Sequence, residues 1–262
     1  MPPSEISVSS KNHDDIAIAG HKLVARDDSR LFILKMLAID SERTFFEKIL
    51  PDSSLVEYCP EYYGVYHKKA DGKFISGEPP AGSTAKPFIC MSNLFRGMER
   101  PNAIELKMGV IQHRQTASES KMAKSVKKCK ATTSWELGFR VNGTLKTLAD
   151  GYVEKKSKFV GRDLKKEDLP SFFKTFFADA SEEQLATIRD QVNGLLDVMS
   201  GPRGAGHRFI STSLLLCFDS GAGGVSRIGM IDFPHIEVIN GIDEGYVKGL
   251  RSLAELLDHV RD

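Results

Sequence analysis

The sequence carries little net charge and few cysteines. Its 36 basic residues nearly balance 35 acidic ones, which leaves a formal charge of +1. Such a balance argues against a general affinity for nucleic acid or anionic membranes, so an anion site would need a local cluster of lysine and arginine. The 4 cysteines lie far apart without a CxxC pair, a spacing typical of neither a zinc site nor a disulfide framework. We therefore expect an intracellular protein, in the cytoplasm or the nucleus, that binds no nucleic acid.

Long apolar runs and several catalytic signatures are also missing. No stretch of about 18 apolar residues occurs and the Ser-rich start has no apolar segment, so we expect neither a membrane span nor a signal peptide. The sequence contains no HExxH, no GxSxG and no GxGxxG after its first predicted strand. Residues 201–206 are rich in glycine, but no Lys-Ser or Lys-Thr follows them, which excludes a Walker A motif.

What is present is the composition of an ordinary globular protein, with 41% hydrophobic and 27% charged residues in a chain of 262. This length is sufficient for one large domain or two closely packed lobes. Strand and helix patterns both recur along the chain and predict an α+β fold. We expect residues 1–13 to be disordered, residues 14–92 to form one lobe and residues 93–262 to form a second, because the composition changes near Ser92 and Asn93.

Local signals place several elements. Asn142-Gly143, between two short strand patterns, is typical of a type I′ turn and predicts a β-hairpin. Ser181, with Gln184 three residues later, is typical of a capping box and predicts the start of a long amphipathic helix. Residues 118–130 predict a helix rich in lysine.

Two charged residues alternate with apolar ones in a predicted strand over residues 103–108. If the apolar side chains at 104, 106 and 108 point inward, Glu105 and Lys107 emerge together on the other face. A carboxylate there could orient an attacking hydroxyl while the neighbouring ammonium group neutralises a transferring phosphoryl group. The alternative is an exposed strand face with one weak ion pair, which is the commoner case for such a segment alone.

The lysine-rich helix follows this strand closely. Lys121, Lys124 and Lys128 are spaced to lie on one helical face. The strand and the helix together bring six cationic groups into one unit, namely Lys107, His113, Arg114, Lys121, Lys124 and Lys128. These groups could enclose a polyanion, whereas a solvated helix face is the alternative for any charge run.

Two further segments are typical of kinase sites. Asp232 follows an apolar strand and a Gly-rich turn, where a carboxylate can hold Mg²⁺ against nucleotide phosphates. Lys35 lies in a predicted strand, and Glu42 and Glu47 follow on the next helix, as in kinases whose strand lysine contacts phosphates and pairs with a helix glutamate. The alternatives are a turn aspartate and an edge-strand lysine.

Six motifs, in the same order along the chain, resemble the inositol polyphosphate kinase family. Residues 101–109, PNAIELKMG, resemble its PxxxDxKxG signature, and the likeness runs from about residue 20 to the C-terminus. The other five motifs are GFRV at 138–141, KFVGR at 158–162, RFISTSLL at 208–215, MIDF at 230–233 and DEGY at 243–246. Gln112-His113 looks more like the inositol hexakisphosphate kinase branch than the trisphosphate 3-kinase branch.

The resemblance implies a two-lobed, protein-kinase-like fold with ATP between the lobes. It implies that Lys35 meets the ATP phosphates, that Asp232 binds Mg²⁺ and that Ser213 lies near both. The segment 89–93 would be the hinge against adenine, with contacts from Ile89, Met91 and Asn93. Ser92-Asn93 stands where the family usually has an acid, which leaves the ribose contacts open.

The same resemblance implies that Lys107 contacts both the substrate and the phosphoryl group in flight. It implies that Lys121, Lys124 and Lys128 bind substrate phosphates, helped by His113, Arg114 and Lys156. One departure from the signature matters, because Glu105 stands where the family has an aspartate that orients the reacting group. A displacement of about an ångström at such a group can cost on the order of a hundredfold in rate.

The function expected from these residues is ATP-dependent phosphorylation of inositol hexakisphosphate to a diphosphoinositol pentakisphosphate, by a monomer. The first alternative is an inositol polyphosphate multikinase or trisphosphate 3-kinase, which adds phosphate to a free hydroxyl. A second is an inositol phosphate sensor whose catalysis is weakened by Glu105. A protein kinase is disfavoured because no HRD-type loop precedes Asp232.

Overall fold

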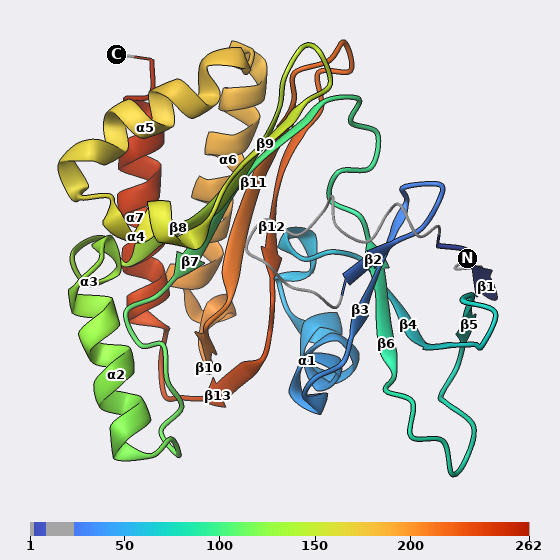
Figure 1. The fold of residues 1–262 in the computed structure, drawn as a ribbon. Helices are drawn as coiled ribbons and strands as arrows, with labels where there is room; N and C mark the ends of the chain where they lie inside the picture. Colours follow the sequence, from blue (N-terminus) through green and yellow to red (C-terminus); the bar gives the residue numbers. More distant parts are fainter. Residues whose placement is uncertain (1–2, 9–23, 262) are drawn as a thin grey trace.

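The computed structural model describes residues 3–8 and 24–261, which form two main antiparallel sheets (Figure 1). The first sheet has six strands in the order β1-β5-β4-β6-β3-β2. Its strands are β1 Glu5–Ile6, β2 Val24–Arg26, β3 Phe32–Met36, β4 Tyr62–Lys68, β5 Phe74–Ser76 and β6 Phe88–Ser92. All six belong to the first part of the chain, and β6 is the last of them.

The second sheet has five strands in the order β12-β11-β7-β8-β9. Its strands are β7 Pro101–Met108, β8 Phe139–Thr147, β9 Val153–Lys156, β11 Ser213–Asp219 and β12 Ser226–Ile231. A separate two-stranded ribbon pairs β10 His207–Ile210 with β13 His235–Val238. The division into lobes between residues 92 and 93 stays a prediction, although the two sheets fall on either side of it.

Six helices pack around the second sheet, away from the first sheet (Figure 1). They are α2 Glu119–Lys130, α3 Thr133–Leu137, α4 Lys158–Asp163, α5 Leu169–Phe176, α6 Glu182–Ser200 and α7 Glu244–Asp258. The predicted capping box is confirmed, because Ser181 Oγ accepts from Gln184 N at 3.1 Å and Gln184 Oε1 accepts from Ser181 N at 2.9 Å. With both sheets and helices, the α+β prediction is confirmed. In the described residues no helix is both long and apolar enough to cross a membrane.

The second sheet has one apolar and one polar face at its centre. Side chains alternate between the faces of a strand, so Ile104, Leu106 and Leu214 join the main core beneath helices α5 to α7. The residues between them, Glu105 and Ser213 among others, lie on the opposite face. The site described below is built on that polar face.

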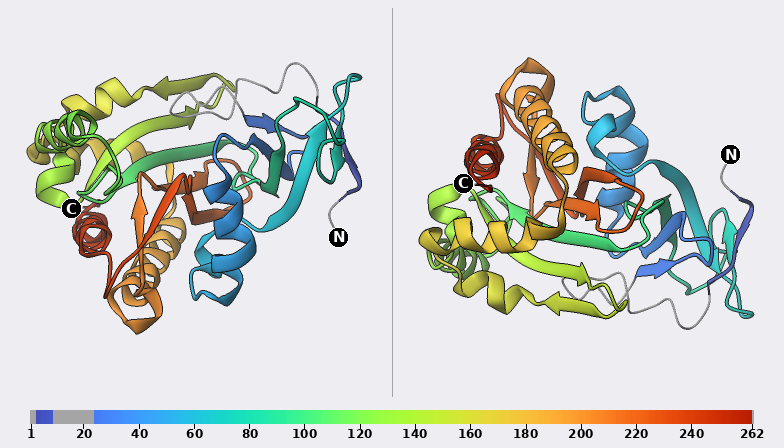
Figure 2. Two further views of the ribbon diagram at one scale, coloured as in Figure 1. Left: turned by 90° about the horizontal axis from the view of Figure 1, so that it is seen from below. Right: turned by 90° about the horizontal axis from the view of Figure 1, so that it is seen from above.

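A short helical segment links the two sheets. It begins as α1 Asp40–Thr44, continues as a π-helical turn over Phe45–Ile49 and ends in a 3-10 turn over Leu50–Asp52. Phe45 stacks on Phe233 with ring centroids 3.9 Å apart, which ties the segment to the residues after β12. Figures 1 and 2 show it beside the β10–β13 ribbon. This packing fixes the position of α1 relative to the second sheet.

Two sequence-based predictions are wrong. Residues 3–8 are not disordered, because β1 pairs with β5 and Ile6, only 3% exposed, joins a small core with Leu34 and Tyr66. The rest of the predicted disordered segment, residues 1–2 and 9–13, lies outside the described residues.

The predicted hairpin turn at Asn142-Gly143 is also wrong. Strand β8 runs straight through both residues, and neither has the positive φ that a type I′ turn requires. Instead Glu105 pairs with Gly143 and Leu106 pairs with Val141, so Asn142 is the extra residue of a β-bulge. Pairing with β7 along its length overrides the local turn signal.

Candidate active site

The ammonium group of Lys35 lies between two carboxylates. Its Nζ donates to Glu42 Oε1 and to Asp232 Oδ1, each at 2.7 Å. Burial lowers the pKa of Lys35, but the attraction of Asp232 and Glu42 outweighs it, so the pKa is raised overall. Glu42 Oε1 also accepts from the backbone N of Phe233 at 3.1 Å. The strand lysine, the helix glutamate and the residue after β12 therefore form one ion-paired unit, as the kinase pattern predicts.

Asp232 adopts the left-handed backbone conformation, with φ of 62°. Aspartate and asparagine tolerate this region better than most residues. The turn lets the carboxylate face Lys35 while the next side chain, Phe233, enters the core. No group of three or more metal-ligating side chains gathers in residues 3–8 and 24–261. A divalent cation at Asp232 would therefore need further oxygen ligands from a bound molecule, such as phosphate groups.

A second chain of hydrogen bonds runs along the polar face of the second sheet. Lys107 Nζ donates to the backbone O of Ser211 and to Ser213 Oγ, the latter at 3.1 Å. Ser213 Oγ donates in turn to Glu105 Oε1 at 2.8 Å. Glu105 and Lys107 thus lie on one face of β7 as alternation predicts. Since Glu105 is only 3% exposed, the alternative of a solvated strand face is wrong.

Burial lowers the pKa of Lys107, and repulsion from Arg140 and Lys35 adds to this effect, while Asp232 and Glu105 oppose it. Ser213, which accepts from Lys107, pairs with Ile231, the residue before Asp232, so the Lys35 unit and the Lys107 chain lie side by side in one site. This site joins the first sheet, through Lys35, to the second, through β7 and β11.

Three more cations border this site. Arg140 is 2% exposed, and burial, followed by repulsion from Arg162, lowers its pKa to about 10. Burial together with Arg140, Arg162 and Lys107 also lowers the pKa of Lys128 on α2. Arg140 Nη1 donates to Gln112 Oε1 at 2.7 Å, but the Nε atoms of Arg140 and Arg162 are buried without a hydrogen-bond partner in the described residues.

This concentration of mutually repelling cations is the electrostatic setting of a polyanion site, because a bound anion would relieve the repulsion. Sequence reasoning missed Arg140 and Arg162 as site residues. Both occur in the family-like motifs at 138–141 and 158–162, which is the signal that could have identified them.

The remaining predicted cations are dispersed. Arg114, Lys121 and Lys124 are exposed, and His113 is partly exposed, so none of the four belongs to the buried floor of the site. Arg114 lies near His235, whose pKa is lowered by burial and by that arginine. Of the predicted lysines on α2, Lys128 is the one that is partly buried, and Lys107 is among the cations that lower its pKa.

Lys156 is not brought into this cluster. It pairs with Thr144, and its Nζ lies 5.5 Å from the ring centroid of Phe172 on α5. It also lines a cavity of about 380 Å³ with residues of that helix. Lys156 therefore lies on the helix-covered side of the sheet, away from Glu105 and Lys107.

The predicted hinge residues fall into two groups. Ile89 pairs with Lys35 in the sheet, and both Ile89 and Met91 are buried. Because pairing residues share a face, Ile89 lies on the same face of the first sheet as Lys35. The side chain of Asn93 instead forms hydrogen bonds with backbone atoms. Its Nδ2 donates to Arg30 O at 2.8 Å and its Oδ1 accepts from Phe95 N at 2.9 Å.

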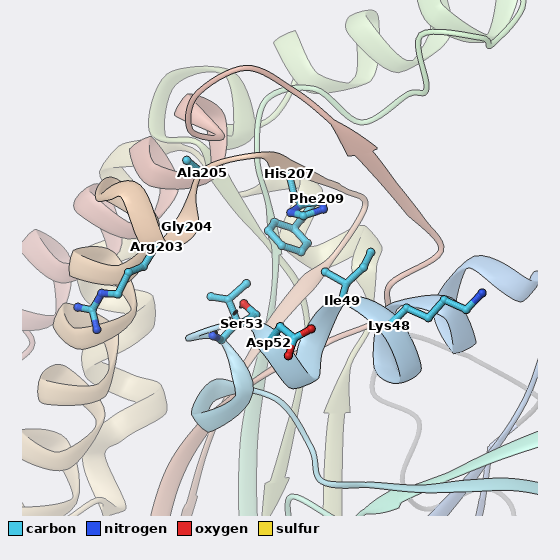
Figure 3. A pocket seen from close by; sticks show the side chains of 10 residues that line it. Lys48, Ile49, Asp52, Ser53, Arg203, Gly204, Ala205, His207 and Phe209 are labelled. Atoms are coloured by element: carbon cyan, nitrogen blue, oxygen red, sulfur yellow. Dashed lines mark hydrogen bonds between the residues drawn. The ribbon is translucent and has the colours of Figure 1, made fainter.

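A separate pocket of about 350 Å³ lies between the end of the α1 segment and strand β10 (Figure 3). Its polar lining includes Lys48, Asp52, Arg203 and His207. None of the predicted site residues lines it. The pocket is therefore distinct from the Lys35–Lys107 site.

The model of the inositol polyphosphate kinase family matches residues 88–258, which include β7, α2, Ser213 and Asp232. The chain belongs to this family. Human inositol hexakisphosphate kinase 3 is 29% identical over 213 residues, which covers 67% of this chain and 52% of the human protein. The mouse enzyme of the same name is 30% identical over 205 residues, with 67% and 51% covered. The chain thus spans about half the length of the curated relatives it matches.

Two solved structures of inositol phosphate multikinases have a similar fold. An inositol phosphate multikinase from S. cerevisiae, Ipk2 in complex with ADP and Mn²⁺, superposes with a TM-score of 0.71 at 21% identity, covering 87% of this chain and 98% of that one. A second inositol phosphate multikinase structure gives a TM-score of 0.66 at 19% identity, with 84% and 99% covered. The kinase-like fold implied by the sequence motifs is thereby confirmed for this inositol polyphosphate kinase family member.

Proposed function

We propose that the protein transfers the γ-phosphoryl group of ATP to inositol hexakisphosphate, giving a diphosphoinositol pentakisphosphate and ADP. The observation that carries this proposal is the junction of two units in one site. The ion-paired Lys35–Asp232 unit suits nucleotide phosphates, and the neighbouring cations Lys107, Lys128 and Arg140 suit a polyanionic acceptor. The similarity to hexakisphosphate kinases favours that acceptor.

On the nucleotide side, ATP would lie between a lobe of residues 14–92 and a lobe of residues 93–262. Lys35 would contact its phosphates, and Ile89 and Met91 would line the adenine end. Asp232 would hold a magnesium ion, with phosphate oxygens completing its ligands, and the ion would supply charge neutralisation at the phosphates. The structure of Ipk2 with ADP and Mn²⁺ supports the use of a nucleotide and a divalent cation.

In the transfer itself, an oxygen of an acceptor phosphate forms a new bond to the γ-phosphorus while the bond from that phosphorus to the β,γ-bridging oxygen breaks. Such reactions depend on positioning and on neutralising charge rather than on covalent catalysis. Lys107 would neutralise charge on the phosphoryl group, and Glu105 would orient the attacking group. Lys128, Arg140 and Arg162 would hold other phosphates of the acceptor.

Two other functions fit the same site. A multikinase or trisphosphate 3-kinase would phosphorylate a free hydroxyl, and the yeast multikinase of the same fold keeps this alternative open. A catalytically weakened sensor would bind the same ligands without turnover, and the replacement of the family aspartate by Glu105 is the feature that favours it.

Product analysis separates the three functions. The purified protein is incubated with MgATP and inositol hexakisphosphate, with inositol trisphosphate in a parallel reaction, and products are resolved by anion-exchange chromatography and NMR. A diphosphoinositol product is expected. Product from the trisphosphate alone would assign the hydroxyl-phosphorylating activity, and binding without product in either reaction would assign the sensor.

The setting of this activity is also proposed. The 4 cysteines are free, and Cys90, Cys129 and Cys217 are buried, which is in keeping with a reducing intracellular compartment. We propose that the protein acts there as a monomer, and size-exclusion chromatography with light scattering would test this.

A further inference from the structure

Asn142 occupies an unusual position opposite Glu105 of β7. It is the extra residue of the bulge in β8, placed where Gly143 pairs with Glu105 and Val141 pairs with Leu106. Its side chain is buried, with 8% of the residue exposed. Asparagine is disfavoured in strands, and a buried amide is costly unless it finds a hydrogen-bond partner. Here the partner is a carboxylate.

Asn142 Nδ2 donates to Glu105 Oε1 at 2.6 Å. The same oxygen accepts from Ser213 Oγ at 2.8 Å. Among the described residues, all hydrogen bonds to the Glu105 carboxylate therefore converge on Oε1. Two donors on one oxygen fix the rotation of the carboxylate and leave Oε2 for a ligand.

The two donors differ in what else they do. Ser213 Oγ also accepts from Lys107 Nζ, so it links the carboxylate to the cation on the same strand face. Asn142 has Glu105 as its side-chain partner and approaches it from the neighbouring strand β8. Without the bulge residue, Ser213 would hold the carboxylate alone, from one side.

We propose that Asn142 is a positioning residue for the reaction: through its hydrogen bond to Oε1 it aims the second oxygen of Glu105 at the attacking group of the acceptor. The inference rests on the proposed function, since it assigns Glu105 the orienting role. It also gives a physical account of how a glutamate can serve here. A longer, more flexible side chain needs an additional fixed donor to hold it in one orientation.

The test is a double-mutant cycle on turnover. N142A, N142D, E105Q and E105Q/N142A are assayed with MgATP and inositol hexakisphosphate. Losing one hydrogen bond to a charged group should lower kcat about tenfold in N142A. The isosteric N142D replaces the donor by an acceptor beside a carboxylate, so it should lose at least as much. KM for both substrates should stay within about twofold, because the contact acts on orientation rather than binding.

The cycle separates positioning from general damage. If Asn142 acts through the Glu105 carboxylate, adding N142A to E105Q should change kcat by less than about twofold. The matched control is T144V, a buried β8 position two residues away on the helix-covered side, which should leave kcat unchanged. Folding is checked for each variant by thermal melting and by ADP binding.

Three outcomes would overturn the positioning role. The first is a wild-type kcat in folded N142A and N142D. The second is a loss of kcat on adding N142A that is as large in E105Q as in the wild-type protein. The third is unfolding of both Asn142 variants while T144V stays folded. Each leaves an active wild-type protein, and so leaves the proposed function standing. A wild-type protein without turnover on any inositol phosphate would instead overturn the proposed function, and the positioning role with it.

Discussion

Lys35 Nζ lies 2.7 Å from Asp232 Oδ1, although the two residues are 197 positions apart in the chain. The same nitrogen lies 2.7 Å from Glu42 Oε1, only seven positions away. Glu42 in turn accepts from Phe233 N, so the early helix and the residues after β12 hold each other in place. The candidate nucleotide site therefore depends on contacts between the two ends of the chain, and its parts should respond together to mutation.

The first prediction concerns Asp232. D232N should lower kcat by at least about a hundredfold, because it removes the carboxylate proposed to hold the divalent cation and to pair with Lys35. The fold should persist, since asparagine tolerates the left-handed φ of 62° found here. The measurement is ADP affinity with and without Mg²⁺. In D232N, Mg²⁺ should no longer increase the affinity for ADP. An increase in ADP affinity as large as in the wild-type protein would contradict the metal assignment.

Alanine is a poorer probe at this position. Its methyl group is strained by about 1 kcal/mol or more in the left-handed conformation, so D232A would combine a catalytic loss with a loss of stability. Comparing the two variants in thermal melting separates these effects. Both variants lose the ion pair with Lys35, so both should melt below the wild-type protein, and D232A should melt at a clearly lower temperature than D232N.

The second prediction concerns the acceptor site. K128M and R162M should each raise KM for inositol hexakisphosphate about tenfold or more and leave KM for ATP nearly unchanged, because both cations belong to the uncompensated cluster around Arg140. K127A is the matched control, an exposed lysine on the same helix. Wild-type KM should rise steeply with salt. Equal effects of K127A and K128M would show that α2 contributes only general charge.

How much of this site could be predicted from sequence depends on how local each signal is. Alternation of apolar and charged residues along β7 correctly predicts that Glu105 and Lys107 share a face. The capping box at Ser181 is equally local and equally reliable. Arg140 alternates with Phe139 and Val141 in the same way, but its place in the site comes from Gln112 and Arg162 across space, which its own segment does not reveal.

The bulge at Asn142 explains the other failures. Asn-Gly is a strong turn signal, but pairing of β8 with β7 on both sides of these residues keeps the strand extended. The extra residue also shifts the alternation, so Thr144 and its partner Lys156 face α5 although Arg140 faces the site. A period-two pattern cannot reveal such a shift, since it depends on the partner strand.

The third prediction follows from that shift. K156A should leave kcat and KM for both substrates within about twofold of wild type, because Lys156 lies over the Phe172 ring on the far side of the sheet. Loss of this cation–π contact should cost about 0.5–1 kcal/mol of stability, measurable by denaturant unfolding. An increase in KM for the inositol substrate comparable to that of K128M would instead return Lys156 to the acceptor site.

The fourth prediction concerns pH. Burial and neighbouring cations hold the pKa values of Lys107 and Lys128 below that of an ordinary lysine. In the free protein, the charged form of these two amines lowers the stability of the folded state. This loss of stability is relieved as the pH rises through the folded-state pKa values, because the amines then lose their protons. A bound polyanion favours the charged form and raises both pKa values. Binding should therefore take up protons at alkaline pH, and affinity should fall as the pH rises through that window.

Calorimetric titration with inositol hexakisphosphate, in two buffers of different ionisation enthalpy, measures this uptake. The uptake should grow as the pH rises from neutral toward the ordinary lysine pKa, because a larger fraction of these amines is then uncharged before the ligand arrives. The phosphate groups of the ligand also exchange protons with both proteins. The difference between wild type and K128M reports Lys128 together with the phosphates that it contacts. Equal uptake by the two proteins at alkaline pH would mean that Lys128 does not change its charge on binding, and would place the acceptor phosphates elsewhere on α2.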